Sequence, residues 1–269
     1  MDRAKQFKIR ILLKKAAYFL AALVLISSIG AGLWFFRNGE FIKINNIEVN
    51  GTVMIPPGEV IELIKGDTGH RGGFLGTILP SEHLFAYKSE EEIRSEIISL
   101  YPRIKNISVS KDLESKQILV SISERKEEII WCKESETPRD CFWLDNEGLI
   151  IGTAPDSKGT LVLVITDNTG RDIKKGEFAI EKYKLEHLSQ MFELAKSLSW
   201  VIEKISISDP ALKEALFDIS SGQEIFISLE RNPLTEGKPI LDAIIAAGKW
   251  PQVDYVDLRI EGKGFYRVE

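Results

Sequence analysis

An uncharged stretch near the N-terminus constrains this chain more than any other feature. Residues 16–36 (AAYFLAALVLISSIGAGLWFF) contain no charged side chain and lie between Lys15 and Arg37. A helix of this length extends about 30 Å, which matches the hydrocarbon thickness of a bilayer. Tyr18 and Trp34 stand near its two ends, where amphipathic aromatic rings prefer the headgroup region. We therefore predict a transmembrane helix over residues 16–36, with the lipid bilayer as its partner.

Charge is distributed unevenly on the two sides of this stretch. The first fifteen residues carry six basic side chains and one acidic one, whereas the remaining 254 residues carry 29 basic and 39 acidic side chains. Because Lys and Arg accumulate on the cytoplasmic side of membrane helices, residues 1–15 are predicted to be a cytoplasmic tail of a single-pass protein of the cytoplasmic membrane. The acidic outer part lacks the basic surface that binds phosphates, so we expect no nucleic-acid partner.

A cleaved signal peptide is the alternative interpretation of the N-terminus. The small residues around Ser28 and Gly30 would suit a signal peptidase. However, the apolar stretch continues through Leu33 to Phe36, and it is longer than the roughly 7 to 15 apolar residues of a signal peptide. These two properties favour a retained anchor.

The chain that follows begins with the pattern of a small α+β domain. Alternating apolar residues predict strands over 41–49, 104–110 and 117–124, and helical spacing predicts helices that begin at Pro56 and Ser89. Ser89 and Glu92 also have the spacing of a capping box, in which each side chain bonds a backbone amide at the helix start. Two helices on one face of a three-stranded sheet would bury the apolar stripes.

From residue 126 onward the pattern becomes mostly β. Strands are predicted over 141–145, 149–151, 161–166, 201–208, 216–220, 223–230 and 253–260. Two amphipathic helices interrupt them, with apolar residues at Leu185, Leu188, Phe192, Ala195 and Leu198 in the first and at Ile240, Ile244 and Ala247 in the second. The prediction is therefore an α+β chain with a first domain over 37–125 and a second, mostly β domain over 126–269.

Four short motifs follow one another in a fixed order along the chain. They are His83–Ile93, Leu100–Val109, Ile118–Arg125 with the later Trp131 and Trp143–Gly148, and Tyr255–Arg259. Together they resemble the FtsQ/DivIB family of bacterial cell-division proteins. Members of that family have a short cytoplasmic tail, one membrane helix, a POTRA domain of order β-α-α-β-β, and a β domain. The resemblance implies that residues 37–125 are the POTRA domain and residues 126–269 the β domain.

The resemblance also implies a function. The chain would be a non-enzymatic scaffold of the division machinery (the divisome), located at the septum, where it recruits and links membrane division proteins. Its β domain would bind a small membrane-anchored protein of the FtsB/DivIC type, itself coupled to FtsL, and its POTRA domain would bind other division proteins.

The last strands of the β domain are the expected interface in this family. An edge strand has unpaired backbone amides and carbonyls, which an added partner strand satisfies. We therefore predict partner binding along the strand 253–260, through Val253, Tyr255, Val256, Asp257, Leu258, Arg259 and Ile260. Tyr255, Asp257 and Arg259 would face one side of this strand, with Val256, Leu258 and Ile260 on the other. The alternative is an ordinary core strand with Asp257 and Arg259 paired on its wet face.

Three features depart from the family pattern. Lys111–Ser115 stands where the family often has an aromatic residue and a proline, and the Gly69–Gly76 loop has the character of an insertion. The pair Cys132 and Cys141 is not a general family feature either. These departures bear on the POTRA surface and its partners more than on the fold.

The two cysteines are too few for a zinc site, which normally has four protein ligands, so we expect no metal. Their spacing also differs from the C-x-x-C of redox enzymes. Outside the cytoplasm a disulfide between Cys132 and Cys141 is the natural interpretation. The alternative is two free buried thiols.

Catalytic and cofactor motifs are missing from the sequence. The three histidines, His70, His83 and His187, offer few partners for a nucleophile, and no G-x-S-x-G occurs. Ser108–Lys111 fits S-x-x-K but falls on a predicted strand, and Gly69–Gly76 lacks the Gly-Lys ending of a phosphate loop. We therefore expect no enzymatic activity and no cofactor.

Two other functions are alternatives for a chain of this kind. A POTRA-type module for polypeptide translocation or outer-membrane assembly would share the first domain, but a barrel would need a run of alternating strands. A membrane-anchored envelope hydrolase would need catalytic groups that the sequence does not bring together.

Overall fold

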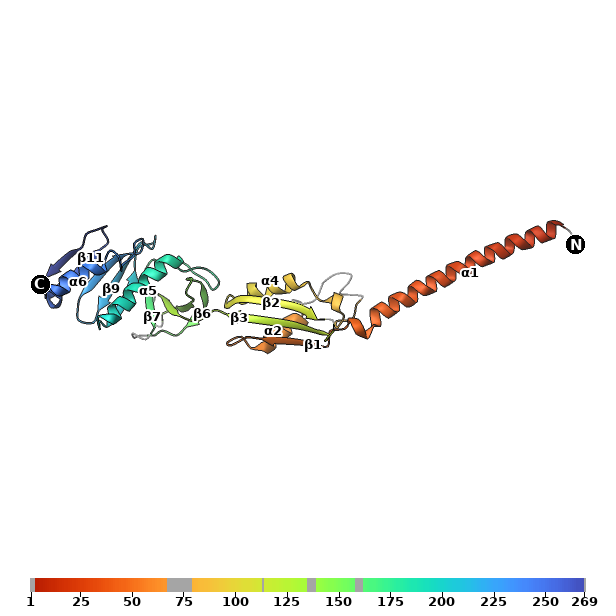
Figure 1. Ribbon diagram of the computed structural model, residues 1–269, viewed down its shortest axis with the longest axis horizontal. Coiled ribbons are helices and arrows are strands. Elements are labelled where there is room, and N and C mark those ends of the chain that lie inside the picture. Colours follow the sequence, from red (N-terminus) through yellow and green to blue (C-terminus); the bar gives the residue numbers. More distant parts are fainter. Residues whose placement is uncertain (1–2, 67–78, 113, 135–138, 158–161, 269) are drawn as a thin grey trace. The chain divides into compact units, whose positions relative to one another are not determined.

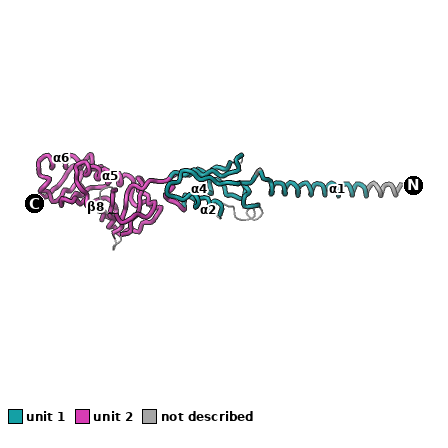
Figure 2. Tube along the Cα trace, turned by 90° about the horizontal axis from the view of Figure 1, so that it is seen from below, with its two compact units in different colours: residues 1–99, 106–123 teal, residues 100–105, 124–269 magenta. Residues whose placement is uncertain are grey.

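The computed structural model describes residues 3–66, 79–112, 114–134, 139–157 and 162–268. The chain divides into two compact units, one over residues 1–99 and 106–123 and the other over 100–105 and 124–269 (Figure 2). The predicted boundary at residue 125 lies two residues beyond the boundary between the units. The second unit also includes the short segment 100–105.

The first helix contains the predicted membrane span. Helix α1 (Arg3–Asn38) is continuous, so the predicted basic tail and the apolar stretch belong to one helix (Figure 1). Its part Leu12–Asn38 is long and apolar enough to cross a membrane. The large apolar side chains of that part are exposed, which fits a helix whose surroundings are lipid.

The rest of unit 1 has the predicted order of strand, helix, helix, strand, strand. After the short η1 (Glu40–Ile42), the elements are β1 (Asn46–Asn50), α2 (Pro57–Lys65), η2 (Leu84–Ala86), α4 (Glu90–Leu100), β2 (Ile104–Asp112) and β3 (Gln117–Glu124). The first strand begins at Asn46 instead of residue 41, because residues 40–42 form a turn of 3₁₀-helix. The sheet order is β1-β3-β2, with β1 parallel to β3. The predicted Gly69–Gly76 loop lies outside the described residues.

The core of unit 1 lies on one face of this sheet. Along β3, Ile118, Val120 and Ile122 are buried while the residues between them are not, so one face is covered and the other is wet. The covering residues come from both helices and include the fully buried Ile64 and Ile93. This is the arrangement that the sequence pattern predicts.

The capping box at the start of α4 is confirmed. The Glu92 carboxylate accepts a hydrogen bond from the Ser89 backbone amide at 2.7 Å, and the Ser89 hydroxyl accepts one from the Glu92 amide at 3.3 Å. Two amides that the helix itself cannot satisfy are therefore paired.

Unit 2 is built on a nine-stranded sheet. Its strands are β4 (Ile129–Lys133), β5 (Cys141–Leu144), β6 (Ile150–Ala154), β7 (Leu163–Asp167), β8 (Ile202–Ile207), β9 (Glu214–Ile219), β10 (Glu224–Ser228), β11 (Val253–Leu258) and β12 (Phe265–Val268). Their spatial order is β12-β11-β10-β9-β8-β7-β4-β5-β6. Strands β4 and β12 are the two that the sequence analysis missed.

Two helices, α5 (Lys182–Ser197) and α6 (Lys238–Ala246), contribute to the main core of unit 2 (Figure 1). The predicted apolar side of α5 is confirmed, since Leu185, Leu188, Phe192 and Ala195 are buried and Leu198 packs against them. In α6 the buried pair is Leu241 and Ile244, whereas the predicted Ala247 is exposed.

Candidate functional site

Strand β11 contains most of the residues predicted to bind a partner, and it is an inner strand. It runs parallel to β10 on one side and antiparallel to β12 on the other. The expectation that 253–260 forms an edge is therefore wrong, because β12 occupies that edge. The strand also ends at Leu258, which leaves Arg259 and Ile260 in the segment that follows.

The side chains of β11 divide between the core and a wet face. Val256 is fully buried and Leu258 is 8% exposed, both within the main core, as is Val253. Tyr255 and Asp257 are half-buried on the opposite face. Val253 and Val256 are three residues apart, so regular alternation would place them on opposite faces. A register shift between Val253 and Tyr255 lets Val253 join the core as well. For these buried residues the core-strand alternative describes the structure.

Strand β12 is one of the two edge strands of the sheet, and β6 is the other. Within the described part of the chain its hydrogen-bonded neighbour is β11 alone. All four of its residues are exposed, with 51% of Phe265, 39% of Tyr266 and 44% of Val268 accessible to solvent. Exposed apolar side chains on an unpaired edge are what natural sheets usually avoid. This edge is the candidate site of the molecule.

Local contacts hold β12 in place. A Cβ at Gly264 would lie 2.5 Å from the Ile240 side chain of α6, so only glycine lets the chain approach the helix this closely. The Lys249 ammonium donates a hydrogen bond to the Tyr266 hydroxyl at 2.8 Å. Arg267 Nε donates to the Asp254 carboxylate at 2.6 Å. The edge is thus a fixed template and not a loose tail.

A row of arginines and aromatic rings leads from the wet face to the edge. The Arg267 guanidinium lies 5.1 Å from the centre of the Tyr255 ring, and Arg259 lies 4.9 Å from the Phe226 ring. The two rings meet edge-on at 6.2 Å. Such cation–π contacts stabilise the face by about 0.5–1 kcal/mol each where solvent reaches them.

Arg259 also pairs with two carboxylates, those of Asp257 and Glu214, each at 2.7 Å. The Arg259 hydrogen bond lowers the pKa of Asp257, and the same bonds raise the pKa of Arg259. This pairing on the wet face is the one that the core-strand alternative describes. These charges are therefore committed to each other within the folded unit.

Sequence reasoning missed β12 because four residues are too few to show alternation. A signal was nevertheless present. Gly262 and Gly264 mark a turn after β11, and the aromatic pair Phe265–Tyr266 directly after it favours a returning strand. Gly262 does adopt a positive φ of 64°.

The predicted disulfide between Cys132 and Cys141 is present. The two residues are direct partners across the antiparallel pair β4 and β5, so the sheet brings the cysteines together. An Asp156 carboxylate oxygen lies within 4.8 Å of both sulfurs. However, both thiols are consumed by the disulfide, and Asp156 accepts a hydrogen bond from Arg139 at 3.0 Å. These atoms therefore do not offer a set of metal ligands.

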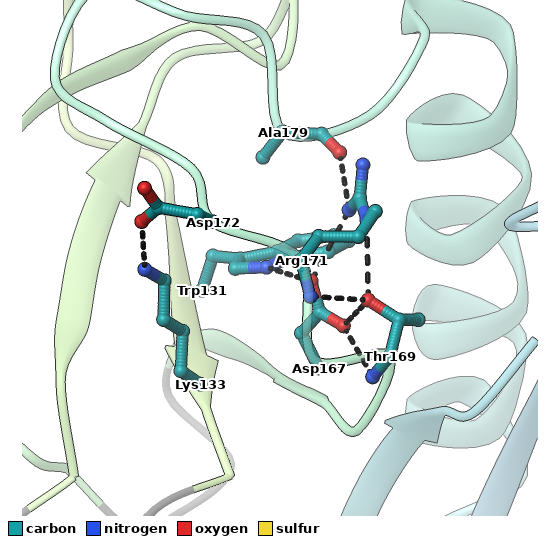
Figure 3. Close-up of polar contacts among 7 residues, drawn as sticks. All are labelled: Trp131, Lys133, Asp167, Thr169, Arg171, Asp172 and Ala179. Carbon is teal, nitrogen blue, oxygen red and sulfur yellow. Dashed lines mark hydrogen bonds and ion pairs between the residues drawn. The ribbon is translucent and has the colours of Figure 1, made fainter. Parts of the chain in front are cut away.

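A buried carboxylate organises the end of β7 (Figure 3). Asp167 is 3% exposed and accepts hydrogen bonds from the Trp131 indole at 3.1 Å, from Arg171 at 3.1 Å and from the Thr169 amide at 2.8 Å. Arg171 in turn donates to the Ala179 carbonyl at 2.9 Å. Each donor meets an acceptor inside the cluster, so the arrangement ties the segment after β7 to the sheet and offers no open catalytic group.

Two of the three histidines, His83 and His187, are engaged with the backbone. His83 contacts the Phe36 carbonyl and the Phe85 amide, and His187 Nδ1 lies 2.8 Å from the Leu229 carbonyl. His70 falls outside the described residues. Ser108 and Lys111 both lie on strand β2. The predicted strand at this place was the reason to reject an S-x-x-K site.

Comparison with protein-family models and with curated proteins finds no match for this chain. The likeness to FtsQ/DivIB proteins therefore rests on the four motifs, and a function has to be argued from the geometry of β12.

Proposed function

We propose that this protein is a membrane-anchored, non-enzymatic scaffold that captures an extended segment of another membrane protein by strand addition at β12. The observation that carries the proposal is the unpaired outer edge of β12, whose large apolar side chains are exposed. Backbone amides and carbonyls of the edge would supply affinity, and alternate side chains would supply specificity.

The pairing of β12 with β11 suggests what the partner segment looks like. Tyr266 is opposite the buried Val256, so it projects to the core side of the sheet, whereas Phe265 and Arg267 project to the wet face. Each face of an added strand would meet an aromatic ring. A partner segment with apolar or aromatic residues on both faces, extended over four or five residues, fits this edge best.

The anchor would give such binding its context. Helix α1 is long and apolar enough to hold the chain in a membrane, with the basic N-terminal residues in the cytoplasm and the two units outside. Partners confined to the same plane meet at a raised effective concentration. The motif resemblance favours a partner of the FtsB/DivIC type, coupled to FtsL, and a role in septum formation, with further division proteins bound by the first unit.

Site-specific photo-crosslinking in cells tests the binding edge. A benzophenone amino acid replaces Tyr266 in one variant and Tyr183 of α5, a tyrosine of similar exposure, in the other. We expect a partner of the FtsB/DivIC type to crosslink to position 266 and not to position 183. Equal crosslinking at both positions, or none at position 266, would overturn the edge as the binding site.

The cellular role is tested separately. A fluorescent fusion of the full chain is followed through the cell cycle, and the proposal expects accumulation at midcell before constriction. An even distribution around the envelope would reject the division role, while crosslinking at position 266 would still identify the partner.

A further inference from the structure

The C-terminal end of α1 contacts His83, which lies 47 residues after Phe36 in the sequence. The Phe36 carbonyl is one of the last four of the helix, which have no partner within it. His83 Nε2 lies 3.1 Å from this oxygen, and the His83 side chain is fully buried. Because His83 Nδ1 accepts a hydrogen bond from the Phe85 amide at 3.3 Å, Nε2 carries the proton and donates to Phe36. His83 therefore caps the helix.

Three aromatic rings surround this cap. Phe36 and Phe85 stack with their centres 5.8 Å apart, and the His83 ring lies 5.2 Å from Phe36 and 5.7 Å from Phe85. The outer sides of the two phenylalanines remain open, with 44% of Phe36 and 47% of Phe85 exposed. Phe36 is the last residue of the uncharged stretch 16–36.

We propose that unit 1 contacts the membrane through Phe85. The Phe85 ring would lie in the outer headgroup region, beside the end of α1. The inference rests on the proposed membrane anchoring, because the Phe85 ring of the folded unit would lie next to the apolar surface of the anchor. Aromatic rings prefer this depth of the bilayer because one side meets acyl chains and the other meets water.

The segment that carries Phe85 is firmly attached to unit 1. The Ile44 amide donates to the Glu82 carbonyl at 2.7 Å, and Lys43 and His83 form a β-bridge. Ala86, directly after Phe85, is 1% exposed. The ring is thus fixed relative to both the core of unit 1 and the helix end, so placing α1 in a bilayer also places Phe85.

Charge does not provide a competing explanation for membrane contact here. The neighbouring charged residues are three basic ones, Arg37, Lys43 and Lys88, and two acidic ones, Glu40 and Glu82, and Lys88 forms an ion pair with Glu96. With Glu96 counted, the net charge is zero, so attraction to anionic headgroups is not expected. The contact should therefore depend on the ring and persist at high salt, where ionic contacts are screened.

Quenching of tryptophan fluorescence by brominated lipids tests this contact. The full chain is reconstituted into phosphatidylcholine vesicles with brominated or ordinary acyl chains. Trp34→Phe removes the tryptophan of α1, and the others, Trp131, Trp143, Trp200 and Trp250, all belong to unit 2. The double variant Trp34→Phe/Phe85→Trp then reports on position 85.

The matched control is Trp34→Phe/Val53→Trp. Val53 is an exposed apolar residue of the same unit, 83% accessible. Val53 comes after the C-terminal end of β1, whereas Ile44 comes before its N-terminal end. Gly51, between β1 and Val53, lies close to the backbone of Ile122 near the C-terminal end of β3. Both double variants add one tryptophan to the same background, so their difference isolates position.

We expect the tryptophan introduced at position 85 to have a blue-shifted emission that brominated chains quench strongly at low and high salt, with no such loss for the tryptophan introduced at position 53. Quenching of the native Trp34 without quenching at position 85 would overturn the contact and leave the anchor standing. If Trp34 itself is not quenched, the anchor fails and the contact with it. Should Phe85→Trp destabilise unit 1, a spin label on Phe85→Cys, probed with oxygen and a water-soluble nickel complex, answers the same question.

Discussion

Val256 of β11 and Tyr266 of β12 are paired directly across the two strands, yet Val256 is fully buried and Tyr266 is 39% exposed. One member of this pair therefore belongs to the core of unit 2 and the other to the β12 edge of its sheet. A change at Val256 acts on folding, whereas a change at Tyr266 acts on whatever binds the edge.

Tyr266→Lys should weaken partner binding and leave the core of unit 2 intact, although it removes the hydrogen bond from Lys249 at the edge. Lysine on an edge strand opposes strand addition, and an aromatic anchor of an interface is commonly worth about 2 kcal/mol, which is more than tenfold in affinity. The measurement is recovery of the partner with the detergent-solubilised chain, together with thermal unfolding of both variants.

Two further variants give this experiment its controls. Tyr183→Lys changes a similarly exposed tyrosine on α5 and should alter neither recovery nor unfolding. Leu258→Glu places a charge in the core and should unfold unit 2, so a loss of binding there says nothing about the edge. Undiminished recovery with Tyr266→Lys would contradict strand addition at β12.

The sequence allowed prediction of elements whose stabilising contacts are local. The capping box at Ser89, the alternating stripe of β3 and the apolar side of α5 each leave a pattern that is legible within about ten residues. The disulfide was predicted on other grounds, because the chain has only two cysteines and both fall in the part predicted to lie outside the cytoplasm.

What could not be predicted depends on the sheet order. Whether β11 is an inner strand or an edge is decided by β12, a four-residue strand whose pairing is not encoded in any periodicity of its own. The parallel pairing of β10 with β11 likewise depends on the crossover through α6 and not on the residues of either strand. The candidate site therefore shifted by one strand.

The cap of α4 is tested by Ser89→Ala. The variant removes the hydroxyl that accepts a hydrogen bond from the Glu92 amide, so the free energy of unfolding of unit 1 should fall by about 1 kcal/mol. Ser95→Ala is the control on the same helix, because its hydroxyl bonds only to the Glu92 carbonyl within the helix. Hydrogen exchange of the α4 amides reports unit 1 specifically, and equal exchange in both variants would contradict the role of the cap.

Loss of the disulfide should destabilise unit 2. The bond joins residues nine apart in sequence, and closing a loop of that size is worth about 2 to 3 kcal/mol by the chain-entropy estimate. The double variant Cys132→Ala/Cys141→Ala should therefore melt at a lower temperature and no longer respond to reductant. A wild-type chain that melts at the same temperature with the bond intact and after reduction in the unfolded state would show that the bond adds no stability.

Asp167→Ala should be among the most damaging single changes in unit 2. It leaves the Trp131 indole and Arg171 without their buried acceptor, and removing one partner of a buried charged network costs about 3 kcal/mol or more. Asp172→Ala, a neighbouring carboxylate that is 74% exposed, should cost far less. Urea unfolding followed by tryptophan fluorescence compares the two, and equal losses would contradict a special role for Asp167.

Asp218 of β9 should lower stability at neutral pH. Burial raises the pKa of Asp218 more than Lys204 lowers it, and Glu203 adds to the rise. Since the folded-state pKa exceeds the unfolded value, the penalty is absent below the unfolded pKa of about 3.9 and appears as the pH rises through the folded pKa. Asp218→Asn should therefore stabilise unit 2 at neutral pH, by less than about 1 kcal/mol because solvent screens a half-buried group.

The gain of Asp218→Asn should vanish in acid, where the native carboxyl is protonated and behaves like the amide. Urea unfolding at neutral pH and near pH 3 measures both limits for the variant and the wild-type chain. Asp172→Asn is the control with the opposite sign, because a hydrogen bond from Lys133 and the charge of Lys174 lower the pKa of Asp172, so its replacement should bring no gain at neutral pH. A gain for Asp218→Asn that persists undiminished in acid would mean that the amide acts through packing and not through removal of charge.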